Sequence, residues 1–375
     1  MRSYLSQAAA VAAMFALAST ASAQITPAAG YTPPDDTPTV SIGGVIFTNF
    51  THTSDPKLTD ADGNLVSGNA FEVARAYVNV TGKISHLVSF RVTPDISGRF
   101  ATTLAAPATG QRASTNYDGS LVYRLKYAFG QLNLDDWMPK GTWVRIGQQQ
   151  TPFLDGMESA YRYRFQGTLF PEREGFLSSS DVGLSAHYMF PREYAEVHAG
   201  VYNGDTYTRA EPNDQKAFQG RLSVRPFAAG APTLRGLRLH GFIVADHYVK
   251  AAPRNRAIGT LTFENKNVNL GIDYVKAKDQ TSAKVAAVEA NGWDVWVTPR
   301  TNIGLEGFFR FDNLKPNDTV DGRKKRTTAG VSYWFKSQKA PAAAAILADY
   351  EAVRYDAILN KPKENRIALH CLFAF

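Results

Sequence analysis

The sequence predicts an all-β protein: a transmembrane antiparallel β-barrel of about sixteen strands, in which one long loop folds into the lumen. Three observations lead to this prediction. The chain ends in an alternating strand that stops at an aromatic residue, it begins with an export signal that no long apolar helix follows, and its strand-like segments are joined alternately by long and short connections.

The last segment, 367–375, alternates between two faces with a period of two residues. One face carries only apolar residues: Ile367, Leu369, Cys371, Phe373 and Phe375. Such a segment fits the final strand of an outer-membrane barrel, with one face toward lipid and an aromatic residue at the membrane interface. We therefore expect the barrel-assembly machinery to engage the strand that ends at Phe375. The alternative is an ordinary antiparallel strand.

The N-terminus has the features of a secretory signal: Arg2, an apolar core over 8–17 and the cleavage motif Ala21-Ser22-Ala23. No later stretch reaches the ~18 apolar residues of a transmembrane helix. Closed barrels are the other way to satisfy every backbone hydrogen bond in lipid, so we expect export to a Gram-negative type of outer membrane. The predicted divisions are a signal peptide (1–23), a proline-rich periplasmic lead-in (24–39) and the barrel (40–375).

Composition and motifs exclude several other classes of protein. The chain has 375 residues, 44% of them hydrophobic, and a formal net charge of +7, which is too polar for a bundle of membrane helices. The single cysteine, Cys371, excludes an intrachain disulfide framework. No nucleophile elbow, phosphate-binding loop or zinc motif is present. We therefore predict no enzymatic activity, no cofactor, no metal site and no nucleic-acid partner.

Alternating segments bounded by Gly, Pro, Asn and Asp predict the individual strands. The segments are 40–52, 71–82, 86–97, 120–134, 141–149, 178–189, 194–203, 216–226, 234–248, 256–265, 267–278, 290–298, 301–313, 324–335, 344–354 and 364–375. Bacterial barrels require an even number of strands, and this set satisfies that requirement.

The connections between these segments alternate in length, as expected when a chain that starts in the periplasm crosses the membrane repeatedly. The long connections, predicted to be external loops, are 53–70, 98–119, 150–177, 204–215, 279–289 and 314–323. The short connections, predicted to be periplasmic turns, include 83–85, 190–193, 266 and 299–300. The turn 227–233 is somewhat longer and the loop 249–255 is short, so the alternation holds for most connections. A soluble β-sandwich has no reason to alternate in this way.

The strand phases place basic residues on the inner face of the barrel. Over 141–149, Val144 and Ile146 face lipid, so Arg145 faces the lumen. Over 120–134, the residues predicted to face lipid are Leu125, Tyr127 and Phe129. Four consecutive strands thus form a basic wall of Arg75, Arg91, Arg124, Lys126 and Arg145. Like charges on one wall of a pore attract anions, unless loop carboxylates pair with them.

Later strands carry more acid on the corresponding face. This acidic wall comprises Glu264, Asp273, Asp294, Glu306, Asp312, Asp349 and Glu351. Because carboxylates in the lumen oppose anion entry, we expect any anion preference to be weak.

The longest connection, 150–177, is dense in aromatic residues, which are poorly suited to an exposed loop. We expect this loop to fold into the lumen and narrow the channel. Its candidate constriction residues are Asp155, Glu158, Tyr161, Arg162, Tyr163, Arg164, Glu172, Arg173 and Glu174. The alternative is an external cap or a subunit contact.

Aromatic residues near the strand ends predict girdles at the two membrane interfaces. They are Trp143, Trp293, Trp296, Tyr333, Trp334, Phe335, Phe373 and Phe375.

The chain resembles outer-membrane porins, in particular the phosphate-selective porin O and P family. The likeness rests on Phe71-Glu-Val-Ala-Arg-Ala-Tyr-Val-Asn-Val-Thr-Gly-Lys83, on Val144-Arg-Ile-Gly-Gln-Gln-Gln-Thr-Pro-Phe153 and on Asp181-Val-Gly183. It extends loosely over most of the mature chain. The resemblance implies a sixteen-stranded homotrimeric channel for hydrophilic solutes, sometimes selective for anions such as phosphate.

These observations predict a porin, embedded in outer-membrane lipid, that passes small hydrophilic solutes or anions by diffusion. Two alternatives remain. An outer-membrane barrel hydrolase would need a Ser/His/Asn or Asp/His set on facing strands. A plugged structural or adhesion barrel would need its wide lumen to be filled.

Overall fold

The computed structural model describes residues 35–99, 121–209, 211–230, 232–335 and 342–375. The chain divides into two units, Met1–Asp36 and Thr37–Phe375, and the second contains the barrel. The predicted signal peptide and most of the predicted lead-in lie outside the described residues. Within the described ranges, no helix is long and apolar enough to cross a membrane.

The second unit is built almost entirely of antiparallel strands. They are β1 (Thr39–Thr59), β2 (Leu65–Lys83), β3 (Val88–Arg99), β4 (Leu121–Asn133), β5 (Trp143–Gln150), β6 (Ser180–Met189), β7 (Ala195–Tyr202), β8 (Ala217–Val224), β9 (Leu237–Ala245), β10 (His247–Val249), β11 (Ala252–Glu264), β12 (Val268–Asp279), β13 (Val288–Pro299), β14 (Leu305–Lys315), β15 (Lys324–Phe335), β16 (Ala343–Tyr355) and β17 (Glu364–Ala374). The described helices are short: α2 (Pro152–Met157), α3 (Phe170–Arg173), and the 3-10 turns η2 (Pro191–Glu193) and η3 (Ala357–Leu359).

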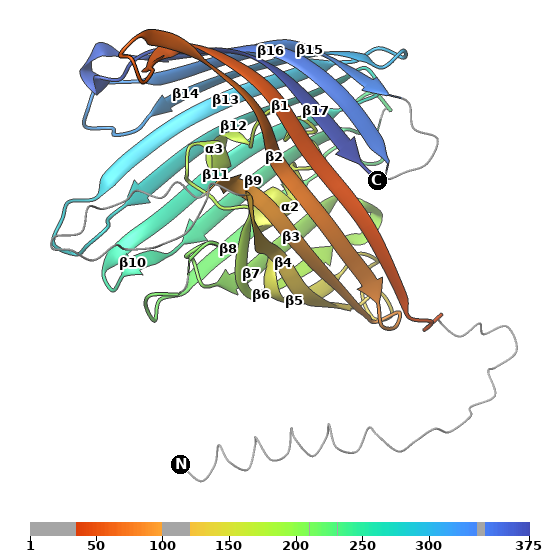
Figure 1. Cartoon of the computed structure of the whole chain (residues 1–375). Helices are drawn as coiled ribbons and strands as arrows, with labels where there is room; N and C mark the ends of the chain where they lie inside the picture. The colour runs from red at the N-terminus through yellow and green to blue at the C-terminus, as the bar shows by residue number, and fades with distance from the viewer. Residues whose placement is uncertain (1–34, 100–120, 210, 231, 336–341) are drawn as a thin grey trace, which may run out of the picture. The chain divides into compact units, whose positions relative to one another are not determined.

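The sheet closes on itself, because β1 pairs with both β2 and β17 (Figure 1). On the opposite side β9 pairs directly with β11, while the three-residue β10 only extends the hairpin beyond Asp246. The wall therefore has sixteen strands, which confirms the predicted closed antiparallel barrel.

The two ends of the barrel differ in their connections. One end, called here the short-turn end, carries tight links such as 265–267 between β11 and β12. The other, the long-loop end, carries the connection 151–179 between β5 and β6. Each of the sixteen predicted segments corresponds to a strand of the wall.

The first predicted loop, 53–70, is wrong, because β1 and β2 continue as a hairpin to a turn at 60–64. Polar residues in this stretch argued against a strand, but a hairpin that rises above the membrane needs no apolar face. The Asp60 carboxylate accepts backbone hydrogen bonds from Asp62 (3.0 Å) and Asn64 (2.8 Å), which fixes the turn.

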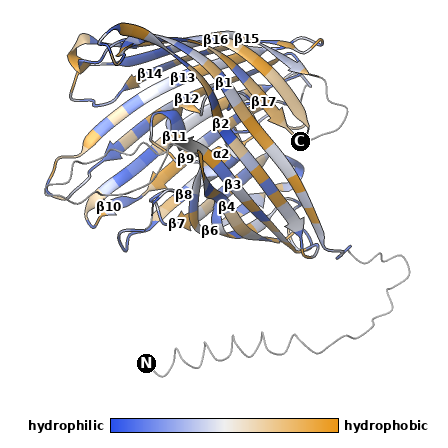
Figure 2. Ribbon diagram, viewed as in Figure 1, coloured by the Kyte–Doolittle hydropathy of each residue, from blue (hydrophilic) through white to orange (hydrophobic). Residues whose placement is uncertain are grey.

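Hydrophobic and hydrophilic residues alternate along the strands (Figure 2). On β12, for example, Ile272 and Tyr274 are exposed on the outer face while Asp273 is buried. Five of the predicted girdle residues are exposed as expected: Trp293, Tyr333, Phe335, Phe373 and Phe375.

Three predicted girdle residues are instead inside the barrel: Trp143, Trp296 and Trp334. Trp296 and Trp334 pack against tyrosines of the connection 151–179, and Trp143 stacks on His187. Their aromatic character alone did not reveal which face of the strand they occupy.

The connection 151–179, called here the internal loop, enters the barrel. Its helices α2 and α3 lie within the ring of strands (Figure 1). Phe153, Leu154, Tyr163 and Phe170 are fully buried there. The prediction that this loop folds inward rather than capping the barrel therefore agrees with its position.

Candidate functional site

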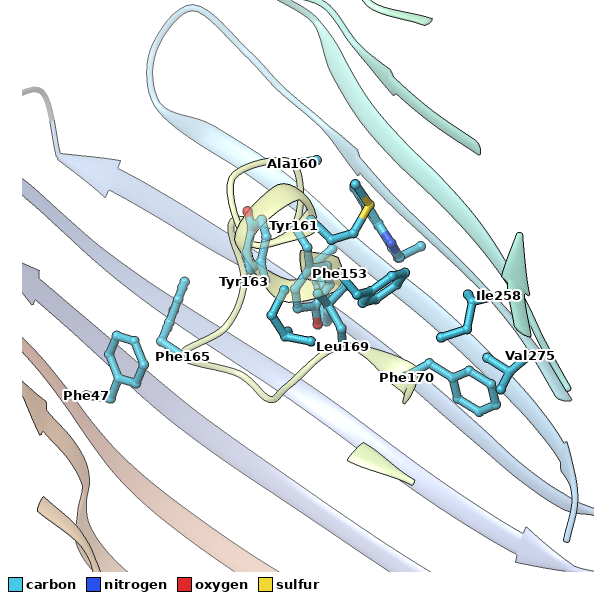
Figure 3. Close-up of a cluster of buried hydrophobic side chains, with 14 of the residues drawn as sticks. Phe47, Phe153, Ala160, Tyr161, Tyr163, Phe165, Leu169, Phe170, Ile258 and Val275 are labelled. Atoms are coloured by element: carbon cyan, nitrogen blue, oxygen red, sulfur yellow. The ribbon is translucent and has the colours of Figure 1, made fainter. Parts of the chain in front are cut away.

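The internal loop has an apolar core of its own, packed on the inner face of the barrel (Figure 3). Phe170 lies toward Ile258 and Val275, and Phe165 lies toward Phe47. Tyr163 stacks on Phe308 with ring centroids 4.6 Å apart. Further contacts come from Phe242, Trp296 and Leu347. Apolar burial of this kind holds the loop across the lumen rather than above it.

Ion pairs attach the same loop to the acidic wall. Arg162 lies 3.1 Å from Glu306, and Arg173 lies 3.0 Å from Glu351. Tyr163 donates a 2.8 Å hydrogen bond to Glu306. These bonds to charged groups are the stronger kind, so they complement the apolar packing.

Arg310, on β14, connects the acidic wall to the internal loop. Its guanidinium donates to both oxygens of Asp312 (2.6 and 3.0 Å). It also donates to the Tyr161 hydroxyl (3.1 Å) and to the Thr168 carbonyl (2.6 Å). The side chain is 1% exposed, so this network is shielded from water.

The acidic wall is therefore covered. Six of its seven members are at most 5% exposed: Asp273, Asp294, Glu306, Asp312, Asp349 and Glu351. The seventh, Glu264, is partly exposed and pairs with Arg238 at 3.0 Å. The prediction that these carboxylates face a water-filled lumen is wrong for the buried six. The internal loop contacts Glu306 and Glu351, Arg310 contacts Asp294 and Asp312, and His370 contacts Asp349.

Within the loop, Arg164 joins two carboxylates, Glu158 at 2.8 Å and Glu172 at 2.6 Å. Burial raises the pKa of Glu172, but the nearby Arg164 guanidinium outweighs it and lowers the pKa below its usual range. Glu174 pairs with Lys324 at 2.7 Å. All nine predicted constriction residues thus belong to a loop in which ion pairs join loop residues to one another and to the wall.

The basic wall is arranged differently. Arg75 pairs with Asp95 at 2.7 Å, and Arg124 approaches the same carboxylate at 3.7 Å. Arg124 keeps 33% of its side chain exposed and donates to the Tyr207 hydroxyl. Arg91 is half-buried and bonds Asn79 rather than a carboxylate. Within the described ranges, Asp95 and Asp155 are the carboxylates that form ion pairs with these five basic residues, and Glu158 and Glu172 also interact electrostatically with Lys126.

Aromatic rings support the basic side chains from behind. Arg145 lies over Trp143, 3.6 Å from the ring centroid, and Arg91 lies 4.5 Å from the centroid of Tyr127. Such contacts fix the orientation of a guanidinium without neutralising its charge. Lys126 differs from the other four: it is 2% exposed, and its ammonium donates to the Tyr77 hydroxyl at 3.2 Å.

A β-bulge explains a wrong prediction on β4. Thr93 pairs with Tyr127 and Pro94 pairs with Leu125, so Lys126 is an extra residue opposite β3. The extra residue reverses the phase, and Tyr127 and Phe129 are buried inside rather than turned to lipid. Leu125, before the bulge, is exposed as predicted.

The basic groups are spread along the depth of the barrel. Arg124 lies toward the long-loop end of β4, whereas Arg91 and Arg145 lie near the short-turn ends of β3 and β5. Arg91 and Arg145 line a hollow of about 360 Å³ together with Phe129 and Gln131. A solute can therefore meet positive charge at several depths.

Asp155 and Arg145 were predicted from the sequence, but His198 and Arg221, the other wall residues that contact α2, were not. His198, on β7, is 3.4 Å from Asp155, which also lies 3.4 Å from Arg145. Burial raises the pKa of Asp155, but the interactions with His198 and Arg145 outweigh it and lower the pKa to about 2. A Cβ at Gly156 would overlap the Arg221 guanidinium, which would have to shift to make room for it. Only the glycine itself could have signalled this contact.

No family model and no curated protein matches this sequence. Solved structures do match in fold. OmpT of Vibrio cholerae is 14% identical over 92% of this chain and 99% of its own, with a TM-score of 0.58. The outer-membrane channel DcaP of Acinetobacter baumannii is 11% identical over 90% and 97%, with a TM-score of 0.58.

An anion-selective porin from Comamonas acidovorans is 10% identical over 90% of this chain and 100% of its own, with a TM-score of 0.58. At these identities the likeness concerns the fold. The chain thus has the fold of a porin-like outer-membrane barrel. The matches do not single out the phosphate-selective porin O and P family, so that narrower resemblance stays a prediction.

Proposed function

We propose that this protein is an outer-membrane porin that lets small hydrophilic solutes diffuse through a water-filled lumen, with a weak preference for anions. The observation that carries the proposal is the contrast between the two walls. The acidic wall is largely buried, partly against the internal loop, whereas much of the basic wall keeps partly exposed charge.

Electrostatics accounts for a weak preference rather than tight binding. Charges are screened beyond ~8–10 Å at physiological salt, so a solute must pass close to a guanidinium to respond to it. The internal loop narrows the lumen and supplies that closeness. Asp95 and Asp155 partly neutralise the basic wall, which limits the preference.

Two of the similar structures support a channel over the hydrolase alternative, because one is described as an outer-membrane channel and the other as an anion-selective porin. One of them is described as the trimer form of OmpT. This supports the proposal that the present chain forms a homotrimer in outer-membrane lipid. The signal peptide predicted over 1–23 is the proposed route of export.

The test is the reversal potential of the reconstituted protein in asymmetric KCl. We expect a value on the anion side that grows as the salt concentration falls. Changing Arg91 and Arg124 to glutamate should move the reversal potential toward cations, because it reverses the charge of the basic wall. Neither residue anchors the internal loop, so the loop should stay in place. Arg354→Glu is a matched control, since Arg354 is exposed on β16 away from the lumen. A double variant with wild-type selectivity at low salt would overturn the proposal.

A plugged barrel is the second candidate, favoured by one specific observation. The apolar core of the loop touches β1 through Phe47 as well as the far wall through Phe242 and Val275. If the loop closes the lumen, the reconstituted protein will assemble but show no ionic steps. Single-channel recording therefore separates the two candidates.

A further inference from the structure

A second hollow opens at the long-loop end, on strands other than those of the basic wall. Its volume is about 570 Å³. The internal loop forms part of its lining through Arg173, and β15, β16 and β17 contribute Arg326, Glu351 and Arg366. All of these residues are within the described ranges.

Three guanidinium groups converge on one carboxylate in this hollow. Glu351 lies 2.6 Å from Arg326, 3.0 Å from Arg173 and 3.2 Å from Arg366. Arg326 also approaches Glu174, but Glu174 already pairs with Lys324 at 2.7 Å. The lining as a whole has four basic side chains, Arg173, Arg326, Lys361 and Arg366, and three carboxylates, Asp55, Glu351 and Glu364, which leaves one net positive charge.

Hydrogen bonding is incomplete as well. Nη1 of Arg173 and Nε of Arg366 are buried, and neither has an acceptor among the described residues. Arg366 keeps 30% of its side chain exposed, so of the three arginines it is the most accessible to a solute. Buried donors without acceptors are costly, which favours an additional anionic partner.

We infer that this hollow binds a small hydroxylated carboxylate. A guanidinium fork matches a carboxylate in shape and charge. Around it, Glu364 and Asp55 provide acceptors for hydroxyl groups, and each is already oriented by a 2.6 Å hydrogen bond, from Tyr355 and from Asn365. These carboxylates and Glu351 repel a dianion more than a monoanion, so phosphate fits less well.

This binding site is separate from the basic wall, and binding of a ligand there does not require the barrel to conduct. Arg366 is also separate from the attachment of the loop, because its ion pair joins β17 to β16. A change at Arg366 therefore leaves the Arg173 and Arg326 pairs with Glu351 in place. This makes Arg366 the residue on which to test the site.

The experiment is isothermal titration calorimetry of the full-length, detergent-solubilised protein with gluconate at 0.15 M salt. We compare wild type with Arg366→Gln, Arg366→Lys and Arg354→Gln. Arg354, on the neighbouring strand β16, is the matched control, because it carries the same charge at the same end of the barrel but does not line the hollow. Heat-modifiable mobility on a gel verifies that each variant is folded.

We expect gluconate to bind wild type, Arg366→Gln to raise Kd about tenfold, as loss of a charged hydrogen bond does, and Arg354→Gln to leave Kd within about twofold. Arg366→Lys should fall between, because it keeps the charge and loses the fork. The inference is overturned if wild type does not bind gluconate, if Arg366→Gln binds like wild type, or if both glutamine variants weaken binding equally. Tighter binding of inorganic phosphate than of gluconate would overturn the class of ligand.

Discussion

The two charged walls of this barrel both contain charged side chains on the inner face, but these side chains differ in burial and in their partners. On the acidic wall, carboxylates are buried under the internal loop and joined to arginines, as Glu306 is to Arg162 and Asp312 to Arg310. On the basic wall, arginines rest on aromatic rings and remain partly exposed, as Arg124 does. The charge that is accessible from the lumen therefore depends on the position of the internal loop and not only on the net charge of each strand.

Removing the loop should produce the largest effect. Replacing 152–177 with a short Gly-Ser linker would uncover the acidic wall and widen the lumen. We expect single-channel conductance to rise several-fold and the reversal potential to move from anions toward cations. Recording in asymmetric KCl measures both. An unchanged conductance in an assembled barrel would contradict the role of the loop.

The second-largest effect is expected from Arg310→Met, which should lower the stability of the acidic wall. The change leaves Asp294 buried without a guanidinium and leaves Asp312 only its 3.7 Å contact with Arg326; removing one partner of a buried pair costs about 3–5 kcal/mol. We expect lower stability in denaturant unfolding and faster proteolysis within the internal loop. Arg238→Met is the control, because its pair with Glu264 is partly exposed and contributes less than about 1 kcal/mol.

The contact of α2 with the basic wall should weaken at low pH. The pKa of Asp155 is lowered, so its carboxylate stabilises the docked loop fully above the unfolded pKa of 3.8. This contribution, about 2 kcal/mol, is lost as the pH falls toward 2. Proteolysis of the loop by an acid-active protease should therefore accelerate between pH 4 and 2, and less so in Asp155→Asn, in which the contribution is already absent.

Lys126→Met should have the smallest effect. Lys126 belongs to the basic wall by sequence, yet it is buried against Tyr77 and cannot approach a solute. We expect the reversal potential to match that of wild type, whereas Arg124→Gln moves it toward cations. Equal shifts in the two variants would mean that exposure does not separate these residues.

Much of the barrel could be predicted from the sequence, because period-two alternation marks most of its strands. The phase of β4 could not, since one bulge residue, Lys126, reverses all that follows it. The loop's inward fold was predictable from its aromatics, but its partners were not. Tyr163 and Glu306 are far apart in sequence, and no local pattern records which distant side chain satisfies a hydroxyl.

The internal loop gives this membrane barrel an apolar core that is shielded from water rather than from lipid. Release of the loop would expose that core to water and raise the heat capacity, as in the unfolding of a soluble domain. Apolar attraction weakens on cooling, whereas the barrel is closed by backbone hydrogen bonds between neighbouring strands. The loop should therefore loosen in the cold while the barrel stays closed, so channel noise should increase as the temperature falls.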